Sequence, residues 1–202
     1  PFAMPVLKHF FRSLNMMPVY RARDGFSTIR KNAETFKQCY HRLGQEDAIL
    51  VFAEANHDLR RRVRPLSKGF TRIAFGAEKH HNWKLDLQVQ TVGLNYGAHQ
   101  DSQSPVHISF GQPIAVSDFH RQYQKDERKA ALDLKDAAAE SLKKVTMHVP
   151  NLQNYPFYHL MLDELEHDRH VLINPQQANA RVDRLHDYLT AARVEQSQKL
   201  LE

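Results

Sequence analysis

The sequence predicts an α/β fold with a mostly parallel central sheet flanked by helices, followed by a helical C-terminal extension. The main observation is an amphipathic helical pattern over residues 27–43, which lies between two segments of strand character at residues 16–21 and 48–53. A strand, a helix and a second strand joined by a crossover of this length form a parallel βαβ unit. The second observation is that the pattern is helical from residue 117 onward.

The N-terminal elements are predicted from short apolar patterns. Residues 5–14 carry apolar side chains at helical spacing and predict a short helix. Residues 16–21 are rich in extended-chain formers and predict a strand. The helix over residues 27–43 has Ser27 as an N-cap, and Gly44 is the type of residue that commonly ends a helix.

The middle of the chain predicts the rest of the core. Residues 48–53 form a continuous apolar run, which is typical of a strand covered on both faces. A polar, arginine-rich loop follows at residues 54–66, and a helix is predicted at residues 67–79. Further strands are predicted at residues 85–96, 106–110 and 113–116.

The C-terminal part is predicted to be helical. Helices are expected at residues 127–147, 155–169 and 178–200, with Asn174-Pro175 separating the last two. We therefore expect residues 1–116 to form the α/β core. Residues 117–202 should form a helical region that packs on this core or extends from it.

Composition and charge narrow the possible functions. Hydrophobic residues make up 42% of the 202 residues, which is enough to bury a core, and no run approaches the roughly 18 apolar residues of a membrane span. The single cysteine, Cys39, excludes an internal disulfide framework. The thirteen histidines show no zinc-finger spacing, so we expect no metal site. A net charge of +5 favours nucleic acid, an anionic membrane surface or a phosphorylated substrate as partner.

The strongest functional signal follows the predicted strand at residues 48–53. Four arginines occur within five residues, a segment we call the arginine loop (residues 60–64): Arg60, Arg61, Arg62 and Arg64. Ligands of open α/β sheets bind outside the C-terminal ends of the strands, and guanidinium groups hold phosphate bidentately. The loop therefore predicts an anion site. The other interpretation of the same residues is a solvated basic loop.

Residues 48–74 resemble the third conserved block of the phospholipid and glycerol acyltransferase superfamily, which includes 1-acylglycerol-3-phosphate acyltransferases. That block reads Phe-Pro-Glu-Gly-Thr-Arg-Ser, then a basic stretch, then Lys-x-Gly at the start of a helix. Phe52 and Glu54 match it, and so do Lys68 and Gly69. The fold that this resemblance implies is the glycerolipid acyltransferase-like α/β core.

Two further segments resemble blocks of the same family. Residues 17–21, Met-Pro-Val-Tyr-Arg, resemble the second block, a strand that ends in arginine. Residues 89–93 resemble the fourth block, usually written Val-Pro-Val. The order and spacing of the three blocks agree with the family.

Some positions depart from these blocks. Ala53 stands for the proline, Ala55 for the glycine and His57 for the arginine of the third block, and Thr91 for the proline of the fourth. Ala55 lacks easy access to positive φ, and His57 is only partly charged at neutral pH. We expect the arginine loop to supply the phosphate-binding charge instead.

The first block of the family, His-x-x-x-x-Asp, does not occur before Arg21. Its histidine would be the general base and its aspartate would orient the imidazole. His81 and Asp86 have the same spacing but lie between the third and fourth blocks, so we interpret them as a chance match. Residue 1 is Pro. We expect that the sequence starts after the first block and that the chain as given is catalytically inactive.

The resemblance implies a bacterial-type acyltransferase of phospholipid biosynthesis, bound peripherally at the cytoplasmic face of the membrane. It would move a fatty acyl group from acyl-CoA or acyl carrier protein, without a metal or redox cofactor, to a lysophospholipid or glycerol-phosphate acceptor. Glu54 would be a supporting catalytic residue that organises the loop and hydrogen-bonds the acceptor. The implied substrate-binding residues are Arg21, Asn56, His57, Arg60, Arg61, Arg62, Arg64 and Lys68.

Two parallel strands ending at Arg21 and Ala53 would bring Arg21 and the arginine loop to the same edge of the sheet, so we expect one shared anion site. The alternative function is a non-catalytic module that uses residues 60–64 to bind anionic lipid headgroups or nucleic acid. Nucleic acid is the weaker version, because the loop lacks interleaved aromatic side chains and no RNA-binding or helix-turn-helix signature is present.

Overall fold

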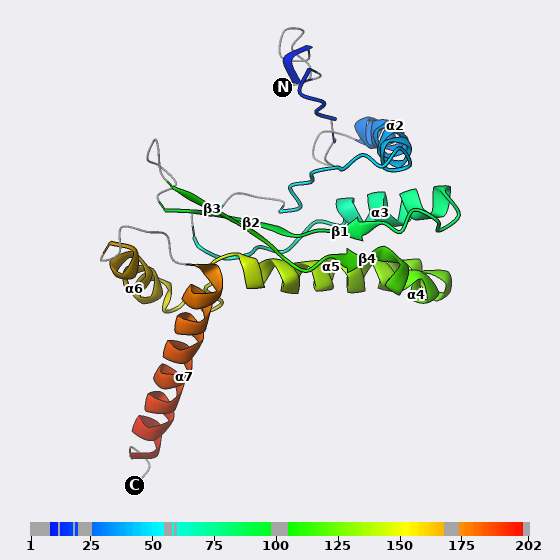
Figure 1. Cartoon of the computed structure of the whole chain (residues 1–202). Coiled ribbons are helices and arrows are strands. Elements are labelled where there is room, and N and C mark those ends of the chain that lie inside the picture. Colours follow the sequence, from blue (N-terminus) through cyan, green and yellow to red (C-terminus); the bar gives the residue numbers. More distant parts are fainter. Residues whose placement is uncertain are drawn as a thin grey trace.

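The computed structural model describes residues 9–11, 13–17, 19, 26–54, 58, 60–97, 105–167 and 174–199. Helices hold most of these residues (Figure 1): α2 (Phe26–Leu43), α3 (Gly69–His80), α4 (His120–Lys125), α5 (Glu127–Val145), α6 (Tyr155–His167) and α7 (Pro175–Lys199). The strands are short: β1 (Gln88–Val89), β2 (Val92–Tyr96), β3 (Val106–Phe110) and β4 (Ile114–Ala115), the last followed by the 3-10 turn η2 (Val116–Phe119).

The strands of the described residues form two small antiparallel sheets. β2 pairs with β3 in a hairpin whose register runs from Val92 opposite Phe110 to Tyr96 opposite Val106. β1 pairs with β4 over two residues each. The prediction of a mostly parallel central sheet flanked by helices is therefore wrong for the part of the chain that the structure describes.

The error lies in the predicted βαβ unit. Residues 48–53 are extended but belong to no strand, and Leu50 and Phe52 are 75% and 79% exposed. An apolar run indicates a propensity for burial, but it does not specify a pairing partner. Here the chain turns back at once, so that Glu54 makes an isolated antiparallel bridge with Leu66. Of the predicted strand at residues 16–21, only residues 16, 17 and 19 are described, and none of them lies in a strand.

The helical predictions from residue 27 onward are confirmed, because their periodicity is a local property of the sequence. Of the short helix expected at residues 5–14, residues 5–8 and 12 lie outside the described residues, so it stays a prediction. The helices expected at residues 27–43, 67–79, 127–147 and 155–169 correspond to α2, α3, α5 and α6, and that at residues 178–200 corresponds to α7. The strand expected at residues 106–110 is β3. The long strand expected at residues 85–96 is interrupted, because β1 and β2 are separated at Gln90 and Thr91. The proposed division of the chain at residue 116 stays a prediction.

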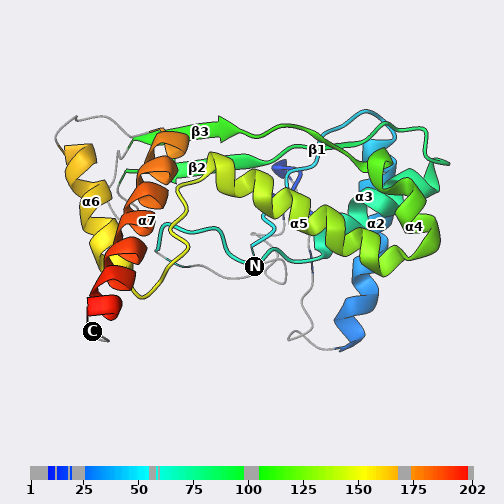
Figure 2. The ribbon, with the colours of Figure 1, turned by 90° about the horizontal axis from the view of Figure 1, so that it is seen from below.

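The helices pack in sequence on one another. α2 contacts α3, and α3 contacts α5, which runs along one face of the β2–β3 hairpin (Figures 1 and 2). One buried cluster lies where α3, η2 and α5 meet, with Phe75 and Leu134 among its members. A second buried cluster joins Met147 and Val149 to Tyr158 of α6 and Val182 of α7.

The β2–β3 hairpin turns its small and polar side toward α5. Gly93 lies against the backbone of Val145 at the C-terminal end of α5, and Asn95 hydrogen-bonds to that same residue. The opposite face carries apolar side chains that are exposed: Leu94, Tyr96, Val106, Ile108 and Phe110. None of the helices within the described ranges combines the length and the apolar character needed to cross a membrane.

Gly93 is required by the close approach of two backbones. A Cβ at this position would meet the carbonyl oxygen of Val145 at 2.0 Å and its carbonyl carbon at 2.7 Å. We predict that Gly93→Ala lowers the free energy of unfolding by about 1–3 kcal/mol, the cost of overpacking a site whose neighbours are backbone atoms. Urea denaturation followed by circular dichroism measures this.

Gly69→Ala is the matched control. A Cβ at Gly69 has Ser67 Oγ at 3.9 Å as its nearest neighbour, and alanine favours a helix over glycine. This variant should be as stable as the parent or slightly more stable. Equal losses in both variants would show that the approach of β2 to α5 is not close in solution.

Candidate functional site

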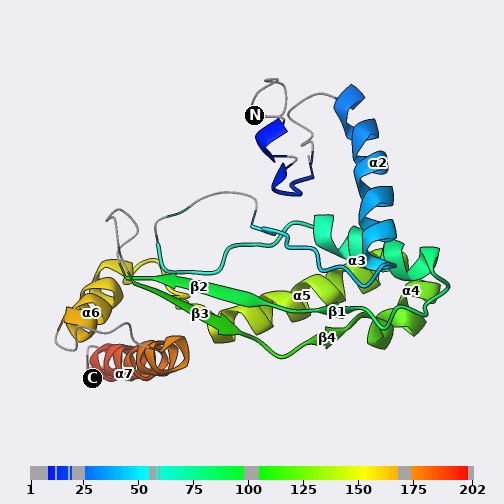
Figure 3. The ribbon, with the colours of Figure 1, turned by 45° about the horizontal axis from the view of Figure 1, so that its top comes forward.

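Glu54 begins the segment of residues 54–66 that contains the arginine loop, and its contacts join the two ends of that segment. The Arg64 backbone N–H donates to Glu54 Oε1 at 2.9 Å, and the Ser67 N–H donates to the Ala53 carbonyl at 2.8 Å. Together with the Glu54–Leu66 bridge, these bonds place the two ends of residues 54–66 side by side. Figure 3 shows the chain leaving α2, passing through this loop and returning to the start of α3. The Glu54 residue is exposed to solvent.

Asp58 gathers three of the four arginines. Its carboxylate accepts from Arg60 Nε at 3.0 Å and Nη2 at 2.8 Å, and from Arg64 Nη1 at 3.0 Å. Arg62 Nε lies 3.7 Å from the same carboxylate and, although buried, makes no hydrogen bond to the described residues. The hydrogen bonds from Arg60, supported by the charge of Arg64, lower the Asp58 pKa to about 2. Sequence reasoning missed Asp58 because it stands just before the arginine run.

Arg61 connects the arginine loop to the C-terminal region of the chain by hydrogen bonds. Its backbone N–H donates to the Tyr155 hydroxyl at 2.7 Å, and its carbonyl accepts from the Val149 N–H at 2.9 Å. Its guanidinium donates to the Gly97 carbonyl at 3.3 Å. Arg61 is therefore not gathered with the arginines at Asp58.

His148 is a second anchor of the loop. The Val63 N–H donates to His148 Nδ1 at 3.0 Å, which requires a neutral ring with its proton on Nε2. Burial, helped by the charge of Lys143, lowers the His148 pKa below its ordinary value and so favours this neutral form. The stability that this anchor contributes is complete above the unfolded pKa of about 6.5 and is lost as the pH falls toward the lowered folded pKa.

The segment that holds the loop is itself fixed by two asparagines. Asn95 of β2 donates to the Val145 carbonyl at 3.1 Å and accepts from the Met147 N–H at 2.8 Å. Asn179 of α7 donates to the carbonyls of Lys143 and Thr146, and accepts from the His148 N–H. No motif marked these residues in the sequence, because their importance depends on three distant segments that meet.

The other predicted site residues lie elsewhere or outside the described residues. Arg21, Asn56 and His57 fall outside the described residues, so the predicted convergence of Arg21 with the arginine loop stays a prediction. Lys68 immediately precedes α3 and lines a cavity between α2, α3, α4 and α5, together with Arg72. Among the described residues, the ion-pair partners of Asp58 are Arg60, Arg62 and Arg64, and Lys68 is not one of them.

His81 joins the C-terminal ends of α3 and α2. Its Nε2–H donates to the Tyr40 carbonyl at 3.1 Å, and its ring lies where a Cβ on Gly44 would be. Asp86 instead accepts from the Gln88 side chain. Both residues are described, and no hydrogen bond joins them. The geometry gives His81 a packing role between two helices.

The match to known families covers this part of the chain. Residues 1–95 match the model of the Acyltransferase family. This match supports a general acyltransferase function for residues 1–95. The acyltransferase segment contains Glu54, the arginine loop and α3, and it ends within β2. No curated protein and no solved structure matches the chain. The family recognised from the three sequence blocks is thereby confirmed, and the roles of single residues stay predictions.

The low pKa of Asp58 gives a test of the loop geometry. Because the folded pKa of about 2 lies below the ordinary value of 3.8, the contribution of Asp58 to stability is present above about pH 4 and is lost as the pH falls toward 2. The stability difference between the parent and Asp58→Asn should therefore shrink over this interval. An NMR titration of the Asp58 carboxyl carbon should give a midpoint near 2. A midpoint near the ordinary value of 3.8 would show that the arginines do not surround Asp58 in solution.

Proposed function

We propose that this chain carries the acceptor-binding part of a glycerophospholipid O-acyltransferase. Its substrates would be an acyl thioester of coenzyme A or acyl carrier protein and a lysophospholipid or glycerol-phosphate acceptor. The observation that carries this proposal is the third block of the acyltransferase segment. In this block the Glu54 carboxylate accepts a hydrogen bond from the arginine loop, and three of the four arginines of that loop gather around the carboxylate of Asp58.

The charge of this cluster suits a phosphate. Arg60, Arg62 and Arg64 surround the single carboxylate of Asp58, which leaves two net positive charges. Asp58 also holds the guanidinium groups in place before a ligand arrives, which reduces the side-chain entropy lost on binding. The Arg62 Nε–H is buried and makes no hydrogen bond to the described residues, so Arg62 is held at the cluster by the charge of Asp58, 3.7 Å away.

The reaction needs a base in addition to this binding site. The acceptor hydroxyl attacks the thioester carbonyl, the carbon–sulfur bond breaks, and the hydroxyl proton passes through a base to the leaving thiolate. His81 shares the required spacing with Asp86, but its Nε2 is engaged with the Tyr40 carbonyl. We propose that this chain binds the acceptor and does not by itself supply the base.

We also propose peripheral association with an anionic membrane surface. The support for this is the arginine cluster together with the exposed apolar face of the hairpin and the exposed run at Leu50 and Phe52. Cationic residues near a membrane surface each contribute about 1 kcal/mol to binding of anionic lipids. Such binding depends on charge and is therefore weakened by salt.

A flotation experiment tests acceptor and surface binding together. At low salt the protein should float with vesicles made of neutral phospholipid to which lysophosphatidate has been added. At high salt it should no longer float with them. The double variant Arg60→Gln/Arg64→Gln should weaken this binding about tenfold or more, because the loss of each arginine lowers the free energy of binding by about 1 kcal/mol. Arg121→Gln, an exposed arginine on α4, is the matched control and should leave binding unchanged. Equal flotation with purely neutral vesicles would contradict the proposed recognition of phosphate.

Turnover is the second test. With acyl-CoA and lysophosphatidate, the chain of residues 1–202 should release thiol at the background rate, and His81→Ala should behave in the same way. The physical reason is the lack of a free, oriented base at His81. Robust thiol release that His81→Ala abolishes would show that His81 is catalytic and that its bond to the Tyr40 carbonyl opens in solution.

A further inference from the structure

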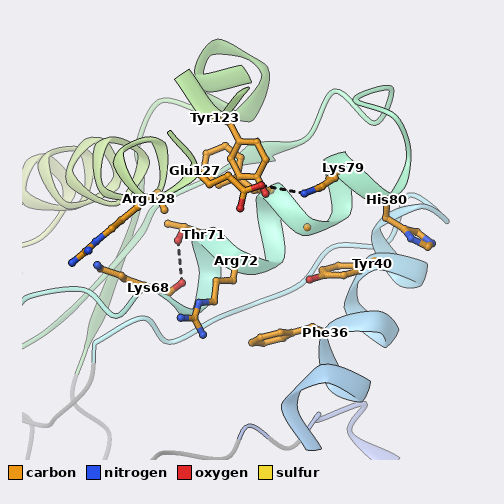
Figure 4. A pocket seen from close by; sticks show the side chains of 13 residues that line it. Phe36, Tyr40, Lys68, Thr71, Arg72, Lys79, His80, Tyr123, Glu127 and Arg128 are labelled. Atoms are coloured by element: carbon orange, nitrogen blue, oxygen red, sulfur yellow. Dashed lines mark hydrogen bonds and ion pairs between the residues drawn. The ribbon is translucent and has the colours of Figure 1, made fainter. Parts of the chain in front are cut away.

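A cavity of about 750 Å³ lies between α2, α3, α4 and α5, separate from the Asp58 cluster (Figure 4). Four cationic residues line it, against the single carboxylate of Glu127, which leaves three net positive charges: Lys68, Arg72, Lys79 and Arg128. Its remaining lining is dominated by aromatic rings from three helices. A cavity with this charge and these walls fits an anion that also carries an apolar, planar group.

Three of the cations are available to a ligand. Glu127 is paired with Lys79 at 3.1 Å, so these two charges largely cancel. Lys68, Arg72 and Arg128 are exposed and have no ion-pair partner within the described ranges. Lys68 and Arg72 lie one helical turn apart at the start of α3, and Arg128 comes from the first turn of α5. In Figure 4 the side chains of Lys68 and Arg128 extend toward the same side of the cavity.

The aromatic walls come from opposite sides. Phe36 and Tyr40 project from α2 toward α3 (Figure 4), while Phe75 of α3 stacks on Tyr123 of α4 with ring centroids 4.7 Å apart. Gly76 lets the Tyr40 ring lie directly on α3, because a Cβ there would collide with the phenol. The Tyr40 hydroxyl makes no hydrogen bond to any described residue. Burial raises the pKa of Tyr40, so this hydroxyl is a neutral donor facing the cavity.

We propose that this cavity binds a nucleotide, with the base stacked on Phe36 of α2 and the phosphates at Lys68, Arg72 and Arg128. Bases stack on aromatic side chains, and arginine binds phosphate bidentately. A simple phosphate would leave the aromatic walls unused. An alkyl chain would find mostly rings, Thr71 and cationic side chains along its path, rather than the aliphatic lining that accommodates it best.

Two sources can supply this chemistry: a free nucleotide such as ATP, and the nucleotide end of a coenzyme A thioester. The second source rests on the proposed function, because it would make the cavity part of the donor site. The nucleotide site itself does not depend on acyl transfer. It follows from the charge and the lining of the cavity alone.

Isothermal titration calorimetry on the whole chain tests the proposal, with adenosine 3′,5′-bisphosphate, ATP, coenzyme A, adenosine and inorganic phosphate as probes. At least one nucleotide should bind, and adenosine or phosphate alone should bind at least about tenfold more weakly. Arg72→Gln and Arg128→Gln should each weaken nucleotide binding about tenfold or more, the loss of a charge-assisted hydrogen bond. Phe36→Leu should weaken nucleotide binding but not phosphate binding.

Arg121→Gln again serves as the control, because it removes the same charge outside the cavity and should leave nucleotide affinity unchanged. Circular dichroism melting curves of the glutamine variants should match the parent, since both lining arginines are exposed. Tighter binding of coenzyme A than of ATP would identify the donor as the source, and the reverse would identify a free nucleotide.

Three results would overturn the proposal. They are binding of none of the nucleotides, affinity for inorganic phosphate equal to that for nucleotides, or nucleotide binding that Arg72→Gln and Arg128→Gln leave unchanged. None of these measurements involves acyl transfer or vesicles. A failure of the nucleotide site is therefore distinguishable from a failure of the proposed acyltransferase function.

Discussion

The C-terminal end of α5 is the point on which the rest of the structure depends. The last carbonyls of a helix have no partners within that helix and must find them elsewhere. Here two asparagines from distant segments provide the partners: Asn95 bonds to the Val145 carbonyl, and Asn179 bonds to the carbonyls of Lys143 and Thr146. Each amide is also an acceptor for the chain that follows, at the N–H groups of Met147 and His148. One junction thus joins the hairpin, α5 and α7.

This junction extends its effect to the candidate site. The segment after α5 contacts the arginine loop through the Val149 N–H to the Arg61 carbonyl and through His148 Nδ1 to the Val63 N–H. Tyr155 of α6 adds a bond to the Arg61 N–H. The family match ends at residue 95. The residues that hydrogen-bond to the arginine loop nevertheless include three that lie at positions 148–155. The helical C-terminal region is therefore a structural support of the acyltransferase segment.

The parts that sequence reasoning predicted are those whose signal is local. Helical periodicity and the end of α2 before Gly44 depend on neighbouring residues, and the structure places those elements close to the expected positions. The parallel sheet depended on a non-local step, the pairing of residues 48–53 with another strand, and no periodicity encodes a partner. The Glu54 loop could be found because its residue types are chemically distinctive. Asn95, Asn179 and His148 could not, because their roles exist only where the three segments meet.

The two cationic regions differ in how their charges are held, although four basic residues contribute to each. In the arginine loop, Asp58 holds the guanidinium groups of Arg60 and Arg64 by hydrogen bonds, so part of their hydrogen-bonding capacity is already used. In the cavity at α3, Lys68, Arg72 and Arg128 lack such a carboxylate and are surrounded by solvent. The side chains of Arg60 and Arg64 are therefore more restricted than those lining the cavity, whereas the cavity has more uncompensated charge. The arginine loop precedes α3 in the sequence, whereas the cavity combines Lys68, Arg72 and Lys79 at α3 with Arg128 of α5. The two regions therefore differ both in the segments that build them and in how their positive charges are held.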